Sequence, residues 1–188
     1  MPNILKEPED VALIERLRDK QTCRQAFGDV IRLYSEPLYW QIRRMVEDHD
    51  DTNDLLQNTF MKAWLSIENF RGDAKLSTWL YKIAINESIT FLASKRKKNN
   101  VSIDDENSLL INAIEADTYI DGDDLKLQLR KAIASLPEKQ RLVFNMRYYD
   151  EMKYDQMSEI LGTSVGALKA SYHPVSYTHL TLPTNSRV

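Results

Sequence analysis

The chain has 188 residues and a formal net charge of -3, with 43% hydrophobic and 28% charged residues. These proportions suit one globular domain or two small ones, and the negative charge argues against a protein that coats DNA non-specifically. The only cysteine, Cys23, excludes an intrachain disulfide or a cysteine-rich metal site. The N-terminus lacks the apolar core of a signal peptide, and no apolar stretch is long enough for a membrane span. We therefore expect a cytoplasmic protein without membrane insertion.

The first predicted element is an amphipathic helical region between about Val11 and Val46. Its apolar residues recur at steps of three and four, which is the period of a helix with one buried face. We expect two helices, joined near Gly28 or Pro37, because glycine and proline interrupt helices. The apolar positions are Phe27, Val30, Ile31, Tyr34, Leu38, Ile42 and Met45.

A second helix is predicted to begin in the polar turn at residues 49–54, where short side chains can cap free amides. Leu56, Phe60, Ala63, Trp64 and Ile67 are expected on its buried face. Its other faces combine carboxylates, amides and two apolar side chains, as a docking surface for a protein does. The candidate docking residues are Asp48, Asp51, Asp54, Leu55, Gln57, Asn58 and Met61.

Neither catalysis nor metal binding is predicted from this region. Asp51 and Asp54 could act as an acid–base pair, but no histidine or second carboxylate pair completes such a site. His49 has no helical partner at metal-ligand spacing. Helix capping or docking is the better interpretation of the carboxylates.

A loop from Asn69 to Lys75 is followed by a helix that is capped by Ser77 or Thr78 and runs to about Lys97. Phe70 could pack beneath the domain, or it could stack on an unpaired base, since bases stack on aromatic rings and hydrogen-bond to amides, cations and loop backbone. Trp79 could likewise be a core residue or a platform for DNA. The candidate base-contacting residues are Asn69, Phe70, Arg71, Gly72, Asp73, Ser77, Thr78 and Trp79.

The same helix carries a polar stripe that points toward a cluster of cations. Lys82, Asn86 and Thr90 are four residues apart, and Lys95, Arg96, Lys97 and Lys98 follow them. Cations at a helix end suit the helix dipole and are often merely solvated, but beside this stripe phosphate contacts become equally plausible. Residues 99–122 then form a flexible linker, and 99–124 hold eight acidic residues and no basic one.

A second helical unit is predicted from about Leu125, with Pro137 at the first turn of one of its helices. Two short helices around Gly162 then form a helix-turn-helix pattern. Met157, Ile160, Leu161, Val165 and Leu168 are expected to face inward.

Residues 174–188 lose the helical period within the second helix of this pattern. The run Val175–Thr184 resembles the translation of a transposon-based sequencing adapter, so we treat the segment as a non-native tail. A natural β-prone tail is the alternative. Pro174 is expected to end the helix, leaving a disordered or poorly packed tail.

Together, these residues resemble the extracytoplasmic-function sigma factors of the sigma-70 family. The resemblance covers roughly residues 20–98 and 123–173. The motifs that carry it are Asp51–Trp64, Asn69–Gly72, Ser77–Asn86, Leu136–Arg141 and the hairpin at 154–173.

The resemblance implies an all-α fold of two small helical domains joined by a flexible acidic linker. A region 2-like domain would span 11–98, followed by the linker at 99–122, a truncated region 4-like domain at 123–173 and the tail at 174–188. Such proteins are non-enzymatic and need no cofactor. Their partners would be core RNA polymerase, promoter DNA and an anti-sigma factor.

The resemblance also implies roles for the candidate residues. The helix that opens at Asp51 would dock on the polymerase clamp, and the loop at Asn69–Asp73 would capture an unstacked base of the proximal promoter element. Lys82 and Asn86 would lie with Ser77, Thr78 and Trp79 along the opened strand, and the terminal cations would touch backbone. The distal element would be read by Ser164, Gly166, Ala167, Lys169, Ala170 and Ser171.

Three departures from the family pattern stand out. Asn53 and Asn58 replace usual acidic residues, Gly166 and Ala167 are smaller than usual, and the basic end of the recognition helix is missing after His173. The alternative is a helix-turn-helix repressor with an N-terminal interaction domain, which would bind duplex DNA by itself. That alternative gives no role to the motifs between Asn69 and Asn86.

Overall fold

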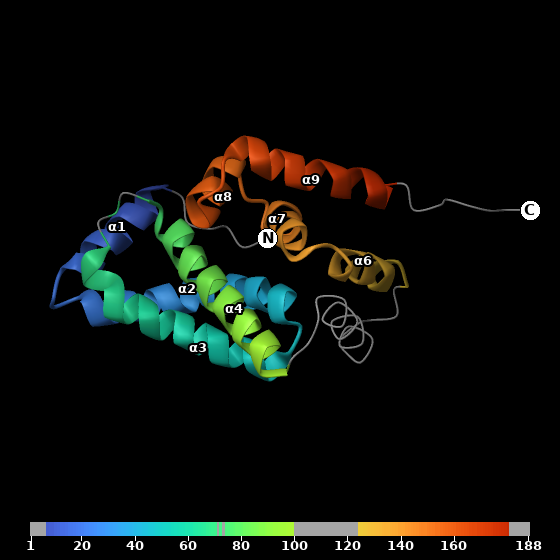
Figure 1. Cartoon of the computed structure of the whole chain (residues 1–188). Coiled ribbons are helices and arrows are strands. Elements are labelled where there is room, and N and C mark those ends of the chain that lie inside the picture. The colour runs from blue at the N-terminus through green and yellow to red at the C-terminus, as the bar shows by residue number, and fades with distance from the viewer. Residues whose placement is uncertain (1–6, 71, 73, 100–123, 181–188) are drawn as a thin grey trace, which may run out of the picture. The chain divides into compact units, whose positions relative to one another are not determined.

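The structure is a computed structural model that describes residues 7–70, 72, 74–99 and 124–180. Within these ranges every regular element is a helix, which confirms the predicted all-α class (Figure 1). The chain divides into two compact units, Met1–Ser94 and Lys95–Val188. No helix in the described ranges is both long and apolar enough to cross a membrane. The predicted linker lies almost wholly outside these ranges.

Helix α1 (Glu7–Arg18) and helix α2 (Cys23–Val46) begin the first unit. Their joint lies at residues 19–22, so the prediction of a joint near Gly28 or Pro37 was wrong. The turn is built by polar groups: the Asp19 carboxylate accepts the Gln21 amide at 2.9 Å, and the Thr22 hydroxyl donates to the Arg16 carbonyl at 2.8 Å. Pro37 remains inside α2 because it is buried in the core, where packing offsets the lost amide donor.

Helix α3 (His49–Ser66) packs against α2 and continues into the short 3-10 helix η1 (Ile67–Asn69). Its inward stripe is rotated by one position from the predicted face: Leu55 is buried and Leu56 is only half-buried. Trp64, predicted as core, is 41% exposed, although its ring lies 5.0 Å from that of Phe27. The buried residues of α3 are Thr52, Leu55, Thr59, Phe60 and Ala63.

Two buried threonines explain the rotation of α3. Thr52 donates its hydroxyl to the Asp48 carbonyl, and Thr59 donates to the Leu55 carbonyl at 2.7 Å. Because each hydroxyl finds a partner four residues back on its own helix, threonine enters the core without an unsatisfied group. A pattern built from apolar residues alone misses these two positions.

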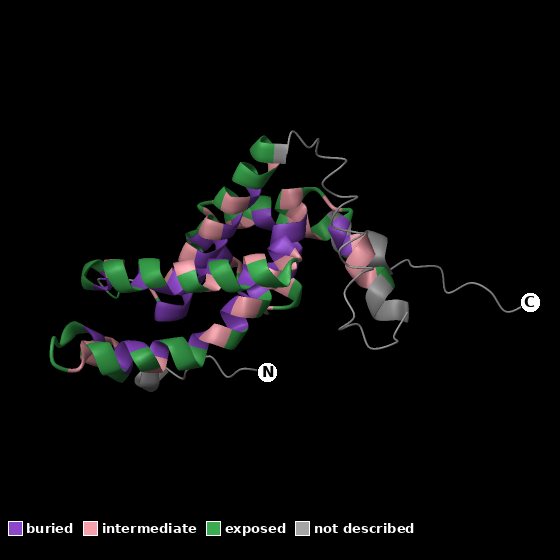
Figure 2. Ribbon diagram, turned by 90° about the horizontal axis from the view of Figure 1, so that it is seen from below, coloured by how far each residue is buried: buried purple, intermediate pink, exposed green. Residues whose placement is uncertain are grey.

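Helix α4 (Leu76–Asn99) crosses α2 in the view of Figure 1. A salt bridge of 2.5 Å between Lys62 and Glu87 ties it to α3. Figure 2 shows the buried positions of this unit on the inward sides of its helices. The buried side of α4 is formed by Leu76, Leu80, Tyr81, Ala84, Ile85, Ser88 and Leu92, together with Ser77 and Thr78.

The second unit contains four helices with described bounds. They are α6 (Asp124–Ala134), α7 (Glu138–Tyr148), α8 (Tyr154–Leu161) and α9 (Val165–Leu180).

The core of the second unit joins distant parts of its sequence. Ile133 of α6 packs with Phe144 of α7, and Tyr172 of α9 stacks on Phe144 with ring centroids 5.8 Å apart. The buried Arg141 donates to the Ala134 carbonyl at 2.9 Å and so holds the end of α6. The sequence prediction that α9 ends at Pro174 was wrong, since the helix continues to Leu180.

Candidate functional site

The outer face of α3 presents a continuous exposed stripe. Asp54, Gln57, Met61 and Leu65 follow one another at steps of three or four, so they share one side of the helix. The stripe is acidic and polar at its start and apolar at its end, where Met61 is 53% and Leu65 74% exposed. Exposed apolar side chains beside polar ones are typical of a protein-binding surface.

The predicted docking set therefore needs one correction. Leu55 is only 4% exposed and packs in the core, because the inward stripe runs through this position. Asn58 and Asp51 are half-buried, while Asp54, Gln57 and Met61 are exposed as predicted. Hydrophobic type alone did not reveal Leu65 or Trp64 as surface residues.

Asp48 has a structural role in addition to any docking role. It is the N-cap of α3, and its carboxylate accepts the Asp51 amide at 2.9 Å. Beside it, His49 is hydrogen-bonded to Tyr39 at 2.7 Å and lies 3.1 Å from the Asn53 amide nitrogen. These side chains fix the start of the helix that carries the exposed stripe.

The loop between η1 and α4 is shaped by an aromatic pair and a glycine. Phe70 is buried, and its ring centroid lies 4.9 Å from that of Trp79. Gly72 has a φ of 79°, which is a left-handed conformation that glycine adopts readily. Asn69 is exposed, whereas Arg71 and Asp73 lie outside the described residues. Phe70 therefore packs beneath the loop, as the first of its two interpretations required.

Helix α4 separates its predicted DNA-binding residues into two groups. Lys82, Asn86 and Thr90 are exposed, as expected for a polar stripe. Ser77 and Thr78 are buried because α4 begins at Leu76, which places them in its first turn on the core side. Lys95, Lys97 and Lys98 are exposed at the far end of the helix and Arg96 is half-buried.

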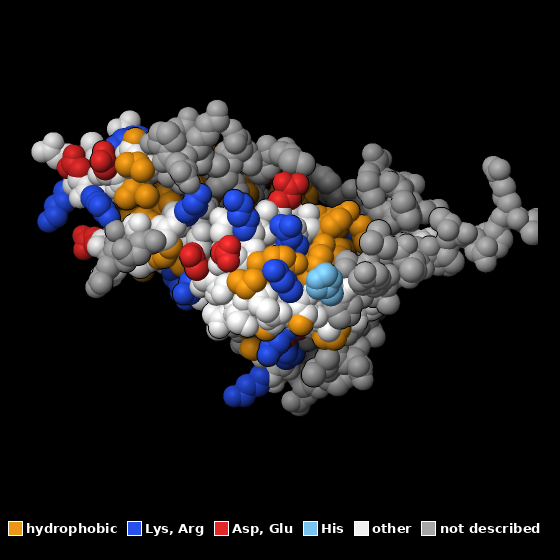
Figure 3. Space-filling view, turned by 90° about the horizontal axis from the view of Figure 1, so that it is seen from above, with side chains coloured by type: hydrophobic (Ala, Val, Ile, Leu, Met, Phe, Trp, Pro, Cys, Tyr) orange, Lys and Arg blue, Asp and Glu red, His pale blue; other side chains and the backbone are white. Residues whose placement is uncertain are grey.

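The helix-turn-helix of the second unit has its turn where it was predicted, because Gly162 takes a left-handed φ of 62° and ends α8. Of the residues predicted to face inward, Met157, Ile160 and Leu168 are buried, whereas Leu161 and Val165 are only half-buried. Ser164 accepts the Ala167 amide at 3.3 Å. Figure 3 looks down on the face that carries α8 and α9, where Lys and Arg side chains stand among acidic as well as uncharged ones.

The candidate distal-element residues lie just before α9 and in its first two turns, and most of them are accessible. Five of the six are exposed and Ser171 is half-buried; they are Ser164, Gly166, Ala167, Lys169, Ala170 and Ser171. The ammonium of Lys169 lies 5.7 Å from the centre of the Tyr154 ring, which links α9 to the start of α8. In the described part of the chain, no three His, Cys, Asp or Glu residues could hold a metal ion.

Comparison with known proteins decides the family. The family model for sigma-70 region 2 matches residues 30–98, and the model for sigma-70 region 4 matches residues 126–173. The ECF RNA polymerase sigma factor SigW of Bacillus subtilis is 30% identical over 82% of this chain and 87% of its own length. The chain belongs to the ECF sigma factors of the sigma-70 family. It is a promoter-recognising RNA polymerase sigma factor, so the repressor interpretation is not retained.

Other relatives agree with this assignment. The sigma-H factor of Pseudomonas aeruginosa is 26% identical over 89% of this sigma factor and 90% of its own length. The sigma factor RpoE of Bartonella quintana, solved with the anti-sigma factor NepR, has a TM-score of 0.64 at 20% identity and covers 86% of this chain and 98% of its own. CnrH, solved with the cytosolic domain of CnrY, also has a TM-score of 0.64, at 19% identity, covering 92% and 96%.

Proposed function

We propose that this sigma factor docks on core RNA polymerase through the outer face of α3 and opens promoter DNA with the following loop and α4. The observation that carries the docking assignment is the exposed stripe formed by Asp54, Gln57, Met61 and Leu65. The helix does not need these side chains for its own core, which is filled by Leu55, Phe60 and Ala63. The stripe therefore combines a polar end with an apolar end, and specific protein interfaces likewise contain both kinds of side chain.

Strand opening would then depend on the loop at Asn69–Asp73 and on the exposed stripe of α4. Loop backbone and the Asn69 amide supply donors and acceptors for the edge of an unstacked base. The ring of Trp79 packs against the ring of Phe70, which belongs to this loop. Lys82 and Asn86 would follow the displaced strand, and the cations at 95–98 would contact phosphates.

The distal promoter element would be read by α9. A recognition helix contacts base edges with residues near its N-terminus, where Ser164, Ala167 and Lys169 are exposed. Glycine and alanine at 166 and 167 leave room for close approach and provide few hydrogen bonds. Contact with base edges would therefore depend strongly on the remaining polar side chains.

Its partners would be core polymerase, promoter DNA and an anti-sigma factor. One structural relative was solved with the anti-sigma factor NepR, and another with the cytosolic domain of CnrY. The protein would work in the cytoplasm as a non-catalytic specificity subunit, without a cofactor.

The docking assignment is tested by measuring affinity for purified core polymerase. Asp54→Ala combined with Met61→Ala should weaken binding at least tenfold, because we place both residues among the few hot-spot residues of the interface, whose truncation costs about 2 kcal/mol or more. Helical content and unfolding temperature should stay close to those of the unmodified chain, since both side chains are exposed.

A matched control places the same two kinds of change on another helix. Glu36→Ala with Leu33→Ala removes one acid and one exposed apolar residue from α2. This variant should bind polymerase normally. Unchanged affinity of the α3 variant, or an equal loss in the α2 variant, would contradict docking through α3.

A further inference from the structure

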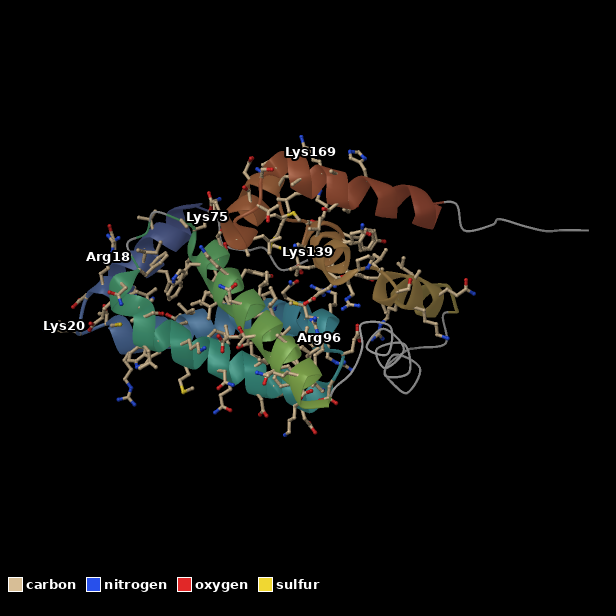
Figure 4. The ribbon with its side chains drawn as sticks, viewed as in Figure 1. Arg18, Lys20, Lys75, Arg96, Lys139 and Lys169 are labelled. Atoms are coloured by element: carbon tan, nitrogen blue, oxygen red, sulfur yellow. The ribbon has the colours of Figure 1, made fainter. Side chains whose placement is uncertain are left out.

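An ion pair joins α3 to α4 between the two surfaces that carry the proposed function. Nζ of Lys62 on α3 lies 2.5 Å from Oε1 of Glu87 on α4. Lys62 directly follows Met61 of the exposed stripe of α3, and Glu87 directly follows Asn86 of the polar stripe of α4. Figure 4 shows both helices with their side chains as sticks. The pair therefore links the helix that would hold polymerase to the helix that would hold the opened strand.

Each member of the pair lies beside the buried face of its helix. Lys62 is three residues after the buried Thr59, and Glu87 is three residues after the buried Ala84, so each shares a side of its helix with a core residue. The side chain of Glu87 is only 18% exposed, whereas that of Lys62 is 54% exposed. Because the carboxylate is largely shielded from water, salt screens this pair less than it screens a pair on the open surface.

The position of Glu87 on α4 gives the ion pair influence over the polar stripe. Lys82, Asn86 and Thr90 lie within two turns of Glu87 on the same helix, and all three are exposed. A helix moves as a stiff body over such a distance, so a rotation of α4 about its axis at Glu87 would turn all three side chains. The ion pair opposes this rotation, since it fixes one side of α4 to α3.

We propose that Lys62 and Glu87 are positioning residues for promoter opening, whose ion pair holds the polar stripe of α4 in a fixed orientation relative to polymerase-bound α3. The inference rests on the proposed roles of α3 and α4, and it adds two residues that neither role includes. Neither side chain has to touch polymerase or DNA. The opened strand would meet Lys82 and Asn86 already in place, so that binding the strand does not have to reorient α4.

The opposite charges of the two residues distinguish positioning from a simple charge effect. Close to DNA phosphates, loss of the positive charge of Lys62 should weaken DNA binding, and loss of the negative charge of Glu87 should strengthen it. Loss of the ion pair should instead impair strand opening whichever partner is removed. The two accounts therefore predict opposite results for the variant at Glu87.

The test measures strand opening by holoenzyme reconstituted from core polymerase and the full chain. The probe is a promoter recovered by transcribing a randomised template pool with this holoenzyme, and single-stranded thymines are mapped with permanganate. Lys62→Gln and Glu87→Gln should each lower the ratio of open to closed complexes roughly two- to fivefold, as expected for loss of a partly exposed ion pair. Both should bind core polymerase normally. Lys62→Arg, and the exchange of Lys62→Glu with Glu87→Lys, should recover most of the opening.

A matched control breaks an ion pair between two other helices. Asp29→Asn removes the carboxylate that binds Arg16 of α1 at 2.9 Å and, like Glu87→Gln, replaces an acid by its amide. This variant should open the promoter normally, because Asp29 connects α2 to α1 and not to α4. An equal loss of opening in Asp29→Asn would show that any weakening of the fold is sufficient, and would overturn the inference.

Other outcomes separate the remaining explanations. More opening by Glu87→Gln than by the unmodified chain, or an exchanged variant no better than the single ones, would overturn the inference in favour of a charge effect. Weaker polymerase binding by Lys62→Gln or Glu87→Gln would place that residue in the docking surface and would also overturn it. Normal opening by Lys82→Ala with Asn86→Ala would instead contradict the proposed role of α4, and the inference with it.

Discussion

Phe70 and Trp79 pack ring against ring, with centroids 4.9 Å apart and planes inclined by 39°. The contact joins the end of η1 to the first turn of α4, so it closes the loop that contains Gly72. Phe70 is 8% exposed. A buried aromatic pair of this kind stabilises the loop whether or not it also meets DNA.

We therefore expect Phe70→Ala to destabilise the first unit. Removal of a buried phenyl group costs about 3–5 kcal/mol, through lost burial and the cavity that remains. Urea denaturation followed by circular dichroism should show a clearly lower midpoint. A midpoint within error of the unmodified chain, together with impaired strand opening, would instead favour a role in base capture alone.

Leu55→Ala should lower stability rather than polymerase affinity. Leu55 is buried, and truncation of a core leucine costs about 2–5 kcal/mol. Thermal unfolding checks the first expectation. A titration with core polymerase at a temperature where the variant is folded checks the second. A variant with normal stability and weak binding would place Leu55 in the interface.

Two substitutions at Asp48 separate its role as a helix cap from the effect of its negative charge. Asp48→Ala should cost about 1 kcal/mol because the Asp51 amide loses its acceptor, while Asp48→Asn should keep the cap. Unfolding temperatures of the two variants make the comparison. If the carboxylate also serves docking, Asp48→Asn will bind core polymerase more weakly without being less stable. Equal destabilisation by both changes would contradict the capping role.

The left-handed backbone of Gly72 should make substitution there unfavourable. Gly72→Ala should destabilise the loop by about 1–2 kcal/mol, since its φ of 79° crowds a Cβ atom. Gly28→Ala is the matched control, because Gly28 lies inside α2 with open space around it. That change should stabilise the chain by up to about 1 kcal/mol. If both substitutions changed the free energy of unfolding in the same direction, relative to the unmodified chain, the result would contradict this account.

The sequence predicted the fold best at positions where a single residue, such as glycine or proline, determines the backbone conformation. Gly162 between two apolar runs predicted the helix-turn-helix, and its left-handed φ of 62° ends α8. Pro137 was predicted in the first turn of a helix and lies one residue earlier, as the N-cap of α7, where the missing amide donor of proline is not needed. The polar stripe of α4 was also predictable, since Lys82, Asn86 and Thr90 recur at a helical period and are exposed.

The sequence did not predict the features that depend on side-chain hydrogen bonds. The turn between α1 and α2 is stabilised by hydrogen bonds of the Asp19 and Thr22 side chains. Such bonds do not alter the spacing of apolar residues, so the hydrophobic periodicity did not reveal this turn. Thr52 and Thr59 likewise enter the core of α3 by bonding to its own backbone, and this rotates the exposed face away from Leu55. The ion pair between Lys62 and Glu87 required the placement of α4 beside α3, which one sequence does not reveal.

Strand opening on a promoter is the most direct test of the central claim. A promoter can be recovered by transcribing a randomised template pool with core polymerase and this chain, and single-stranded thymines are then mapped with permanganate. We predict no site-specific footprint from the chain alone. With core polymerase the proximal element should open, and Asp54→Ala with Met61→Ala should abolish that opening. A site-specific duplex footprint from the chain alone, or normal opening by the double variant, would contradict the account.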